Sequence, residues 1–290
     1  MGIHYLQLGA TLFIPASHQN LHSIVSGNKY SALKSLVIDF EDGLQEDAFV
    51  SAMQSVEAIF EGISATSPLV FLRAKNSKHL KELLKIENIQ NVNGFVLAKF
   101  SLSNADEYLN ILKDREFLIM PSIEGEELFS HEKLHTLKEK IVANKQKVLL
   151  VRFGLEDMLS QLGMRRSCTE SIFDRAVTAS VVGNFIATFK SAGFAVSGGV
   201  YPCFQDLEGF KNDVSRDIQE GLISKTIIHP SQIEPINELY KVSEVAFTQA
   251  KEIETSTKNI FNQDGKMAET HTMKNYSQEI LLRAKIYGVD

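Results

Sequence analysis

The sequence predicts an α/β protein in which eight parallel strands close into a (β/α)8 barrel, with a C-terminal helical extension. Short apolar runs alternate with amphipathic segments, and this alternation repeats eight times. The runs are nearly continuous, as is typical of parallel strands that are buried on both faces. A chain of 290 residues that is 44% hydrophobic has the size and composition for one such barrel. An open, doubly wound sheet is the alternative, and the count of eight strands favours the barrel.

The expected strands are the runs at residues 11–15, 35–40, 69–74, 94–100, 116–124, 147–154, 193–199 and 225–230. Apolar residues at steps of three and four predict intervening helices, most clearly at residues 51–63, 77–86 and 131–143. The tail differs: residues 235–260 predict one long helix, 262–267 a polar turn and 276–288 a last helix. We therefore expect a catalytic barrel over residues 1–234 and a helical extension or lid over residues 235–290.

Composition excludes several classes of function. The net charge of −6 argues against a nucleic-acid partner, which would need a clustered basic surface. No apolar stretch approaches the roughly 18 residues of a membrane helix, and the first residues show no secretory signal pattern. The two cysteines, Cys168 and Cys203, fit neither a zinc site nor a disulfide framework. We expect two reduced thiols in a cytoplasmic protein that contacts no membrane.

Charged residues stand where the expected strands end. Active sites of (β/α)8 barrels lie at the C-terminal ends of the strands, so these side chains should meet at one rim. They are Asp39, Glu41, Asp42, Arg73, Lys99, Glu124, Glu156, Asp157 and His229, with Gln232 just beyond. Mg²⁺ takes one or two carboxylates and keeps positions for water and substrate oxygens. Glu124 and Asp157, on neighbouring strands, are therefore the predicted Mg²⁺ ligands, and Mn²⁺ is the alternative ion.

Each of these residues also has a structural interpretation. Glu124 and Asp157 would be surface ion-pair partners, and Arg73 would only neutralise the acidic rim. Asp39 and Glu41 are two residues apart, so Phe40 points away from both of them. Asp39 is expected to be structural, and Glu41 and Asp42 are expected to be functional. Lys99 fits a counter-ion better than a Schiff-base lysine. His229 and His18 fit loop histidines as well as they fit ligand-binding residues.

The chain resembles the citrate lyase β-subunit family, which includes malyl-CoA lyases and belongs to a wider aldolase superfamily. The similar segments occur in the family's order along nearly the whole chain. They are LFIPAS (12–17), VIDFEDG (37–43), FLRAKN (71–76), LAKF (97–100), PSIEG (121–125), FGLEDMLSQLG (153–163), DLEGF (206–210), KTIIHPSQI (225–233) and DGKM (264–267).

The resemblance implies roles for residues of this chain. Glu124 and Asp157 match the metal ligands, and Arg73 matches the arginine that binds the oxo acid and stabilises the enolate. The acidic pair Glu41 and Asp42 matches residues that orient metal-bound water. Gly154, Leu155 and Glu156 match a substrate-binding segment. Glu269 occupies the position of a lid residue that transfers a proton in a neighbouring subunit.

These features predict a Mg²⁺-dependent carbon–carbon lyase. It would cleave, or form by condensation, a β-hydroxy acid or its CoA thioester and give a 2-oxo acid such as oxaloacetate, glyoxylate or pyruvate. A lid shared between subunits predicts a homo-oligomer, a trimer or hexamer. Ala16, Ser17 and His18 replace the family's usual residues where CoA is held. Two alternatives are therefore a CoA-independent aldolase and a non-catalytic barrel subunit of a larger complex.

Overall fold

The computed structural model describes residues 2–290, and it divides into two compact units. The first ends at Ile233, and the second comprises Glu234–Asp290. None of the helices within residues 2–290 has the length and apolar character that a membrane span requires.

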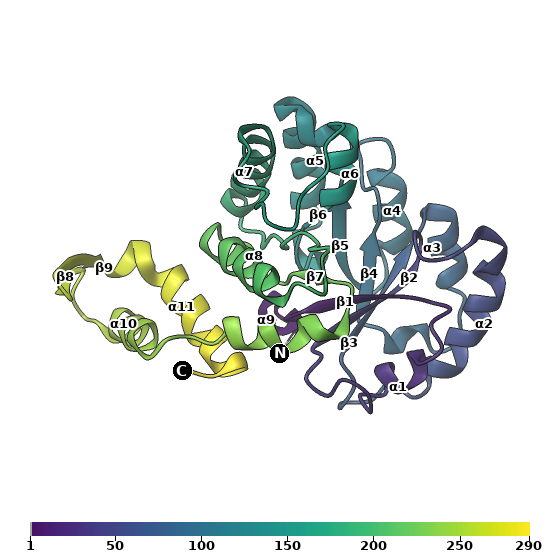
Figure 1. The fold of residues 1–290 in the computed structure, drawn as a ribbon, viewed down its shortest axis with the longest axis horizontal. Helices are drawn as coiled ribbons and strands as arrows, with labels where there is room; N and C mark the ends of the chain where they lie inside the picture. Colours follow the sequence, from purple (N-terminus) through teal and green to yellow (C-terminus); the bar gives the residue numbers. More distant parts are fainter. Residues whose placement is uncertain (1) are drawn as a thin grey trace. The chain divides into compact units, whose positions relative to one another are not determined.

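The first unit is a parallel sheet surrounded by helices, as Figure 1 shows. The strand order is β6-β5-β4-β3-β2-β1-β7, and every neighbouring pair is parallel. The strands are β1 (Thr11–Pro15), β2 (Ser35–Phe40), β3 (Leu69–Ala74), β4 (Gly94–Leu97), β5 (Leu118–Ile123), β6 (Arg152–Phe153) and β7 (Thr226–Ile227). The α-helices are α1 (Leu21–Val25), α2 (Phe49–Phe60), α3 (Ser77–Leu83), α4 (Ala105–Leu112), α5 (His131–Val142), α6 (Leu155–Gln161), α7 (Ala176–Ser191), α8 (Leu207–Gln219) and α9 (Ile233–Leu239), the last of which continues into the second unit.

The segment expected as the seventh strand, residues 193–199, closes the gap between β6 and β7. It forms parallel bridges from Val196 to Val151 on one side and from Ser197 to Ile223 on the other. These bridges are too short to count as a strand, but they complete the ring of eight segments. The predicted (β/α)8 fold is therefore confirmed, with one segment reduced to bridges.

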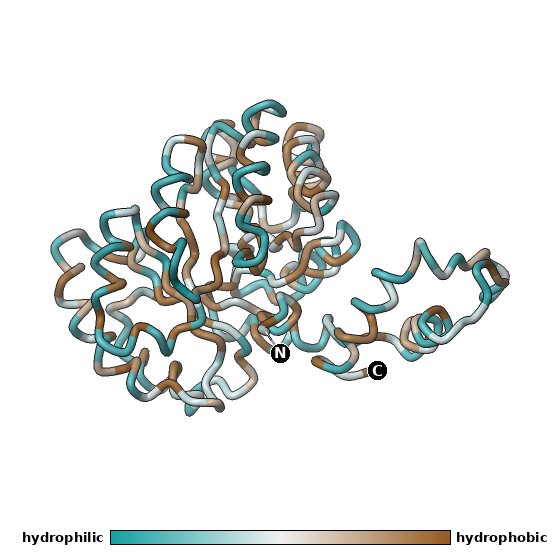
Figure 2. Tube along the Cα trace, turned by 180° about the vertical axis from the view of Figure 1, so that it is seen from behind, coloured by the Kyte–Doolittle hydropathy of each residue, from teal (hydrophilic) through white to brown (hydrophobic). Residues whose placement is uncertain are grey.

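The barrel interior is filled by side chains from alternate positions of successive strands. Its buried core includes Val37, Phe71, Val96, Met120 and Leu150, with Leu8 of the N-terminal 3-10 helix η1 (Tyr5–Leu8). Figure 2 shows the hydrophobic segments gathered along the central strands. Inward side chains of a strand recur every two residues, so the next inward residues are Asp39, Arg73, Ser122 and Arg152. The barrel interior thus changes from an apolar core to a polar layer over two residues of these strands.

The second unit differs from the expected single long helix. It contains α10 (Glu244–Thr255), a hairpin of β8 (Ile260–Gln263) and β9 (Lys266–Glu269), and α11 (Thr270–Tyr287). The long-helix prediction is wrong because the chain leaves the helix before Ser243, whose hydroxyl caps α10 by accepting from the N–H of Ala246. The polar turn is a hairpin turn, in which Asp264 and Gly265 both have positive φ.

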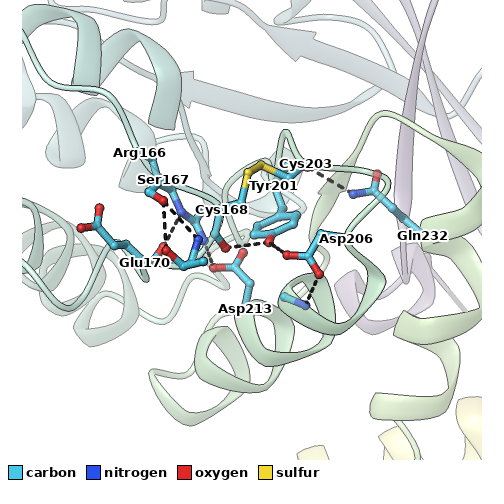
Figure 3. Close-up of a disulfide and its surroundings, with 11 residues drawn as sticks. Arg166, Ser167, Cys168, Glu170, Tyr201, Cys203, Asp206, Asp213 and Gln232 are labelled. Carbon is cyan, nitrogen blue, oxygen red and sulfur yellow. Dashed lines mark hydrogen bonds and ion pairs between the residues drawn. A yellow bond between two sulfur atoms is a disulfide. The ribbon is translucent and has the colours of Figure 1, made fainter.

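The expectation of two reduced thiols is also wrong. Cys168 and Cys203 form a disulfide, with their Cα atoms 5.9 Å apart (Figure 3). It joins the loop after α6 to the loop before α8, and Tyr201 supports it by donating a hydrogen bond to the carbonyl of Cys168 at 2.8 Å. Disulfides persist mainly in oxidising compartments, so the cysteines no longer support a cytoplasmic location.

Candidate active site

Arg73 on β3 is the centre of an acidic cluster at the C-terminal ends of β2 and β3. Its Nε and Nη2 donate to the two carboxylate oxygens of Asp39, each at 2.7 Å. Its Nη2 also lies 3.2 Å from Asp42, and its Nη1 lies 3.0 Å from Glu41. Burial alone would lower the pKa of Arg73, but hydrogen bonding and the surrounding charges raise it above its ordinary value. The register explains the bidentate contact, because Asp39 and Arg73 are directly paired on neighbouring strands.

Glu41 is a buried carboxylate with incomplete hydrogen bonding. Besides Arg73, the ammonium group of Lys99 lies 3.3 Å from it, so Lys99 is a counter-ion as expected. Neither carboxylate oxygen accepts a well-directed hydrogen bond from residues 2–290. Burial raises the pKa of Glu41, and the charge of Arg73 opposes that shift. A buried carboxylate in this state has unused capacity to accept hydrogen bonds.

Glu124 directly follows β5, and Asp157 lies in the first turn of α6, which follows β6; their side chains form the carboxylate pair that the sequence predicts. Glu124 is 6% exposed and accepts a hydrogen bond from the backbone N–H of Lys99 at 2.6 Å. Burial, the negative charge of Asp157 and that of Glu41 raise the pKa of Glu124 to about 8. Two carboxylates held this close repel each other unless a proton or a cation lies between them.

Neighbouring residues fix the position of this carboxylate pair. A Cβ atom at Gly154 would lie 2.3 Å from the Cβ of Glu124, so only glycine permits this close approach. Gln161, at the end of α6, donates to the backbone carbonyl of Glu124 at 2.5 Å and to that of Asp157 at 3.1 Å. Lys99 has φ 46°, a left-handed conformation that directs its N–H towards Glu124.

Two cavities meet at Glu124 and Asp157, which line both of them. The first has a volume of about 360 Å³. Its lining also includes five further predicted site residues, Asp42, Arg73, Gly154, Leu155 and Glu156. Other residues that line it are Phe13, Ser122, Arg152 and Thr226. The second, of about 730 Å³, is also lined by Lys99 and Gln161. We refer to the first as the inner cavity and to the second as the outer cavity. Most of the predicted site residues therefore surround one space.

Arg152 lines the inner cavity and was not predicted from the sequence. It stands inside the apolar run KVLLVRFG, whereas the predicted site residues stand at strand ends. A charge within an otherwise apolar, buried strand was the signal that could have found it.

The remaining predicted residues lie elsewhere. His229 caps the 3-10 helix η6 (Pro230–Gln232) and stacks on Phe204 with ring centroids 4.7 Å apart, as a structural histidine does. The Nδ1 atom of His18 accepts from the N–H of Asn20 in the loop after β1. Glu269 ends β9 in the second unit, so its part in proton transfer stays a prediction.

The donor set suits a hard divalent ion. Residues 2–290 contain no group of three or more His, Cys, Asp or Glu side chains arranged around a metal position. They do contain the pair of the buried Glu124 and the partly exposed Asp157 and, beside it, the oxygens of Glu41, which accept no well-directed hydrogen bond from these residues. Two carboxylates with space for water are the usual protein contribution to a Mg²⁺ site.

The family model described as C–C bond lyase of the TIM-barrel fold matches residues 2–289. The chain therefore belongs to this family of carbon–carbon lyases.

Curated relatives match over short stretches only. An L-malyl-CoA/beta-methylmalyl-CoA lyase from Cereibacter sphaeroides is 35% identical over 68 residues, which cover 23% of this chain and 21% of that enzyme. A (3S)-malyl-CoA thioesterase from the same species is 29% identical over 90 residues, 31% of this chain and 30% of the thioesterase. The matched stretches thus span under a third of either relative.

Solved structures share the fold over most of their length. CitE from Mycobacterium tuberculosis, in complex with magnesium, acetoacetate and coenzyme A, has a TM-score of 0.68 at 17% identity and covers 97% of this chain and 99% of its own. A citrate lyase from Burkholderia xenovorans has a TM-score of 0.76 at 17% identity, covering 98% and 93%. At this identity the likeness establishes the fold alone.

Proposed function

We propose that this protein is a Mg²⁺-dependent lyase that cleaves the CoA thioester of a β-hydroxy acid, or forms it by condensation, with a 2-oxo acid as the second fragment. The observation that carries the proposal is the carboxylate pair of the buried Glu124 and the partly exposed Asp157 beside the Arg73 cluster, at the barrel end where such enzymes act. Relatives named as malyl-CoA lyase, a CitE structure with magnesium and coenzyme A, and a citrate lyase beta subunit structure with magnesium and oxaloacetate support the same chemistry.

Glu124 and Asp157 would hold the ion, with Mn²⁺ as the alternative to Mg²⁺. When bound, the ion supplies positive charge that stabilises the oxygens on which negative charge develops as the carbon–carbon bond breaks. Glu41, whose carboxylate lies 3.0 Å from Arg73 and 3.3 Å from Lys99, is the residue proposed to orient water in the site. Gly154, by having no side chain, leaves Glu124 in place.

The reaction needs one proton to leave the β-hydroxyl and one to reach the new carbanion. The hydroxyl oxygen becomes the carbonyl of the oxo acid, and the electron pair of the broken bond passes to the thioester fragment as an enolate. Arg73 stabilises the negative oxygens through its guanidinium group, and Glu269 is the residue proposed to move the proton. The outer cavity provides room beside the carboxylates for the part of the thioester remote from the broken bond. A homo-oligomer, a trimer or hexamer, completes the proposal.

The test is release of a 2-oxo acid from citryl-CoA and malyl-CoA, detected as its phenylhydrazone. We expect Mg²⁺-dependent release that Glu124→Gln lowers by about 100-fold or more, because loss of outer-shell partners alone costs a metal site 10–100-fold. Glu132→Gln, on the exposed face of α5, is the matched control and should act as wild type. Turnover of the free hydroxy acids instead would assign a CoA-independent aldolase. Oxo-acid release that is unaffected by chelation of the metal would contradict the proposal.

A further inference from the structure

Arg152 on β6 is a buried cation without a carboxylate partner. It is 2% exposed, and no carboxylate within residues 2–290 forms an ion pair with it. Its Nη1 donates a hydrogen bond to the hydroxyl of Thr226 at 3.1 Å, but its Nε and Nη2 have no hydrogen-bond partner in the described chain. Buried charges in proteins are almost always paired, so an unpaired one indicates a missing anion.

The surroundings compensate only part of this charge. The guanidinium carbon of Arg152 lies 5.3 Å from the ring centroid of Phe13, and that of Arg73 lies at the same distance from the same ring. A cation–π contact attracts the charge but satisfies no N–H group. Burial and then the positive charge of Arg73 lower the pKa of Arg152 to about 9.

The free edge of Arg152 has the shape that recognises a carboxylate. Nε and Nη2 are adjacent donors on one side of the planar guanidinium, and together they match the two oxygens of a carboxylate. Arg73 uses the same two donors to bind Asp39, with both distances at 2.7 Å. This edge of Arg73 is therefore already occupied by Asp39, whereas the equivalent edge of Arg152 has no acceptor among residues 2–290.

Arg152 also lies at the right depth for the second end of a substrate. It pairs in register with Ser122, two residues before Glu124 along the same inward face of β5. At about 3.3 Å per residue this places Arg152 roughly 7 Å deeper in the barrel than the carboxylate pair. Both line the inner cavity, so one small molecule can contact the metal site at its outer end and Arg152 at its inner end.

We propose that Arg152 binds a second carboxylate of the substrate, so that the oxo-acid fragment is a dicarboxylic acid of the oxaloacetate class and not a monocarboxylic one such as pyruvate or glyoxylate. This inference rests on the proposed function, because it takes the other end of the oxo acid to lie at Glu124 and Asp157. The inference distinguishes dicarboxylic from monocarboxylic oxo acids, which the carboxylate pair of Glu124 and Asp157 alone does not.

The experiment is calorimetric titration of the Mg²⁺-loaded protein with pyruvate and with freshly dissolved oxaloacetate. Wild type should bind oxaloacetate roughly 10- to 100-fold more tightly, the usual contribution of hydrogen bonds to a charged group. Arg152→Met should reduce the affinity for oxaloacetate to that for pyruvate and leave pyruvate binding unchanged. Arg152→Lys, which keeps the charge but loses the paired donors, should retain part of the preference. Arg115→Met, in an exposed turn after α4, is the matched control.

The outcomes separate this inference from the proposed function. Equal affinities of wild type for the two acids would overturn the inference without any variant, and Mg²⁺-dependent binding of both would leave the proposed function intact. Equal loss of pyruvate and oxaloacetate binding in Arg152→Met would show a merely structural arginine and would also overturn it. If wild type bound neither acid in the presence of Mg²⁺, the proposed function would fail and the inference with it.

Discussion

Replacement of Gly154 by alanine tests how the carboxylate pair is positioned. The new Cβ would lie 2.3 Å from the Cβ of Glu124 and 2.6 Å from its Oε2. Carbon atoms in contact prefer about 3.5–4.0 Å, so Glu124 or the start of α6 must shift by more than about 1 Å. Gly154→Ala therefore acts on the proposed metal ligand without removing any donor atom.

The expected magnitude follows from two effects. Overpacking a buried position costs about 1–3 kcal/mol of unfolding free energy. A displacement of about 1 Å at a catalytic group can cost on the order of 100-fold, so we expect Mg²⁺ affinity to fall by roughly 10- to 100-fold. Calorimetric titration with Mg²⁺ and chemical denaturation measure the two effects separately.

Gly183→Ala on α7 is the matched control for this variant. Nothing lies within 4 Å of a Cβ atom at Gly183, and the residue is exposed in a helix. Alanine there should stabilise the protein by about 0.5–1 kcal/mol and leave Mg²⁺ binding unchanged. The reasoning is refuted if Gly154→Ala binds Mg²⁺ within twofold of wild type.

Three further predictions concern charge and cross-linking. Because the pKa of Glu124 is raised to about 8 and only its ionised form binds a cation, Mg²⁺ affinity should fall roughly tenfold per pH unit below pH 8. Calorimetry at several pH values measures this, and a flat profile between pH 6 and pH 8 would contradict it. Reduction of the Cys168–Cys203 disulfide, which links residues 35 apart, should lower the unfolding free energy by about 2–4 kcal/mol. Denaturation with and without dithiothreitol tests this, with the Cys168→Ala/Cys203→Ala double variant as the insensitive control. Lys225→Met should cost about 3–5 kcal/mol, because it leaves the carboxylates of Asp213 and Asp217 buried together, and a loss below 1 kcal/mol on denaturation would count against the buried ion cluster.

The barrel could be predicted because its signal is local. Apolar runs and helical periodicity identify each strand and helix without knowledge of their partners. The second unit was predicted less well, although the cues were present. Ser243 followed by Glu244 is a helix-start signal, and Asp264-Gly265 between two short runs is a hairpin signal. Neither signal changed the prediction, because the amphipathic pattern of the tail indicated helices.

The carboxylate pair could be predicted because strand ends of a barrel meet at one rim, which places Glu124 near Asp157 without coordinates. The disulfide could not, because two cysteines show no pairing until the fold brings their loops together. The ion pairing of Arg73 and Arg152 could also not be predicted from the sequence. The sequence shows two arginines in strands. Only the contacts reveal that Asp39 binds the first and that, among residues 2–290, no carboxylate pairs with the second.

The most direct test of the central claim is a crystal structure of the protein soaked with Mn²⁺, located by its anomalous scattering. Mn²⁺ takes the same oxygen ligands as Mg²⁺ and can be distinguished from water. We expect one site at which carboxylate oxygens of both Glu124 and Asp157 lie at about 2.2 Å from the ion, with water or an oxo acid on the side of the inner cavity. An ion bound elsewhere, or no ion at these carboxylates under conditions that support catalysis, would contradict the account.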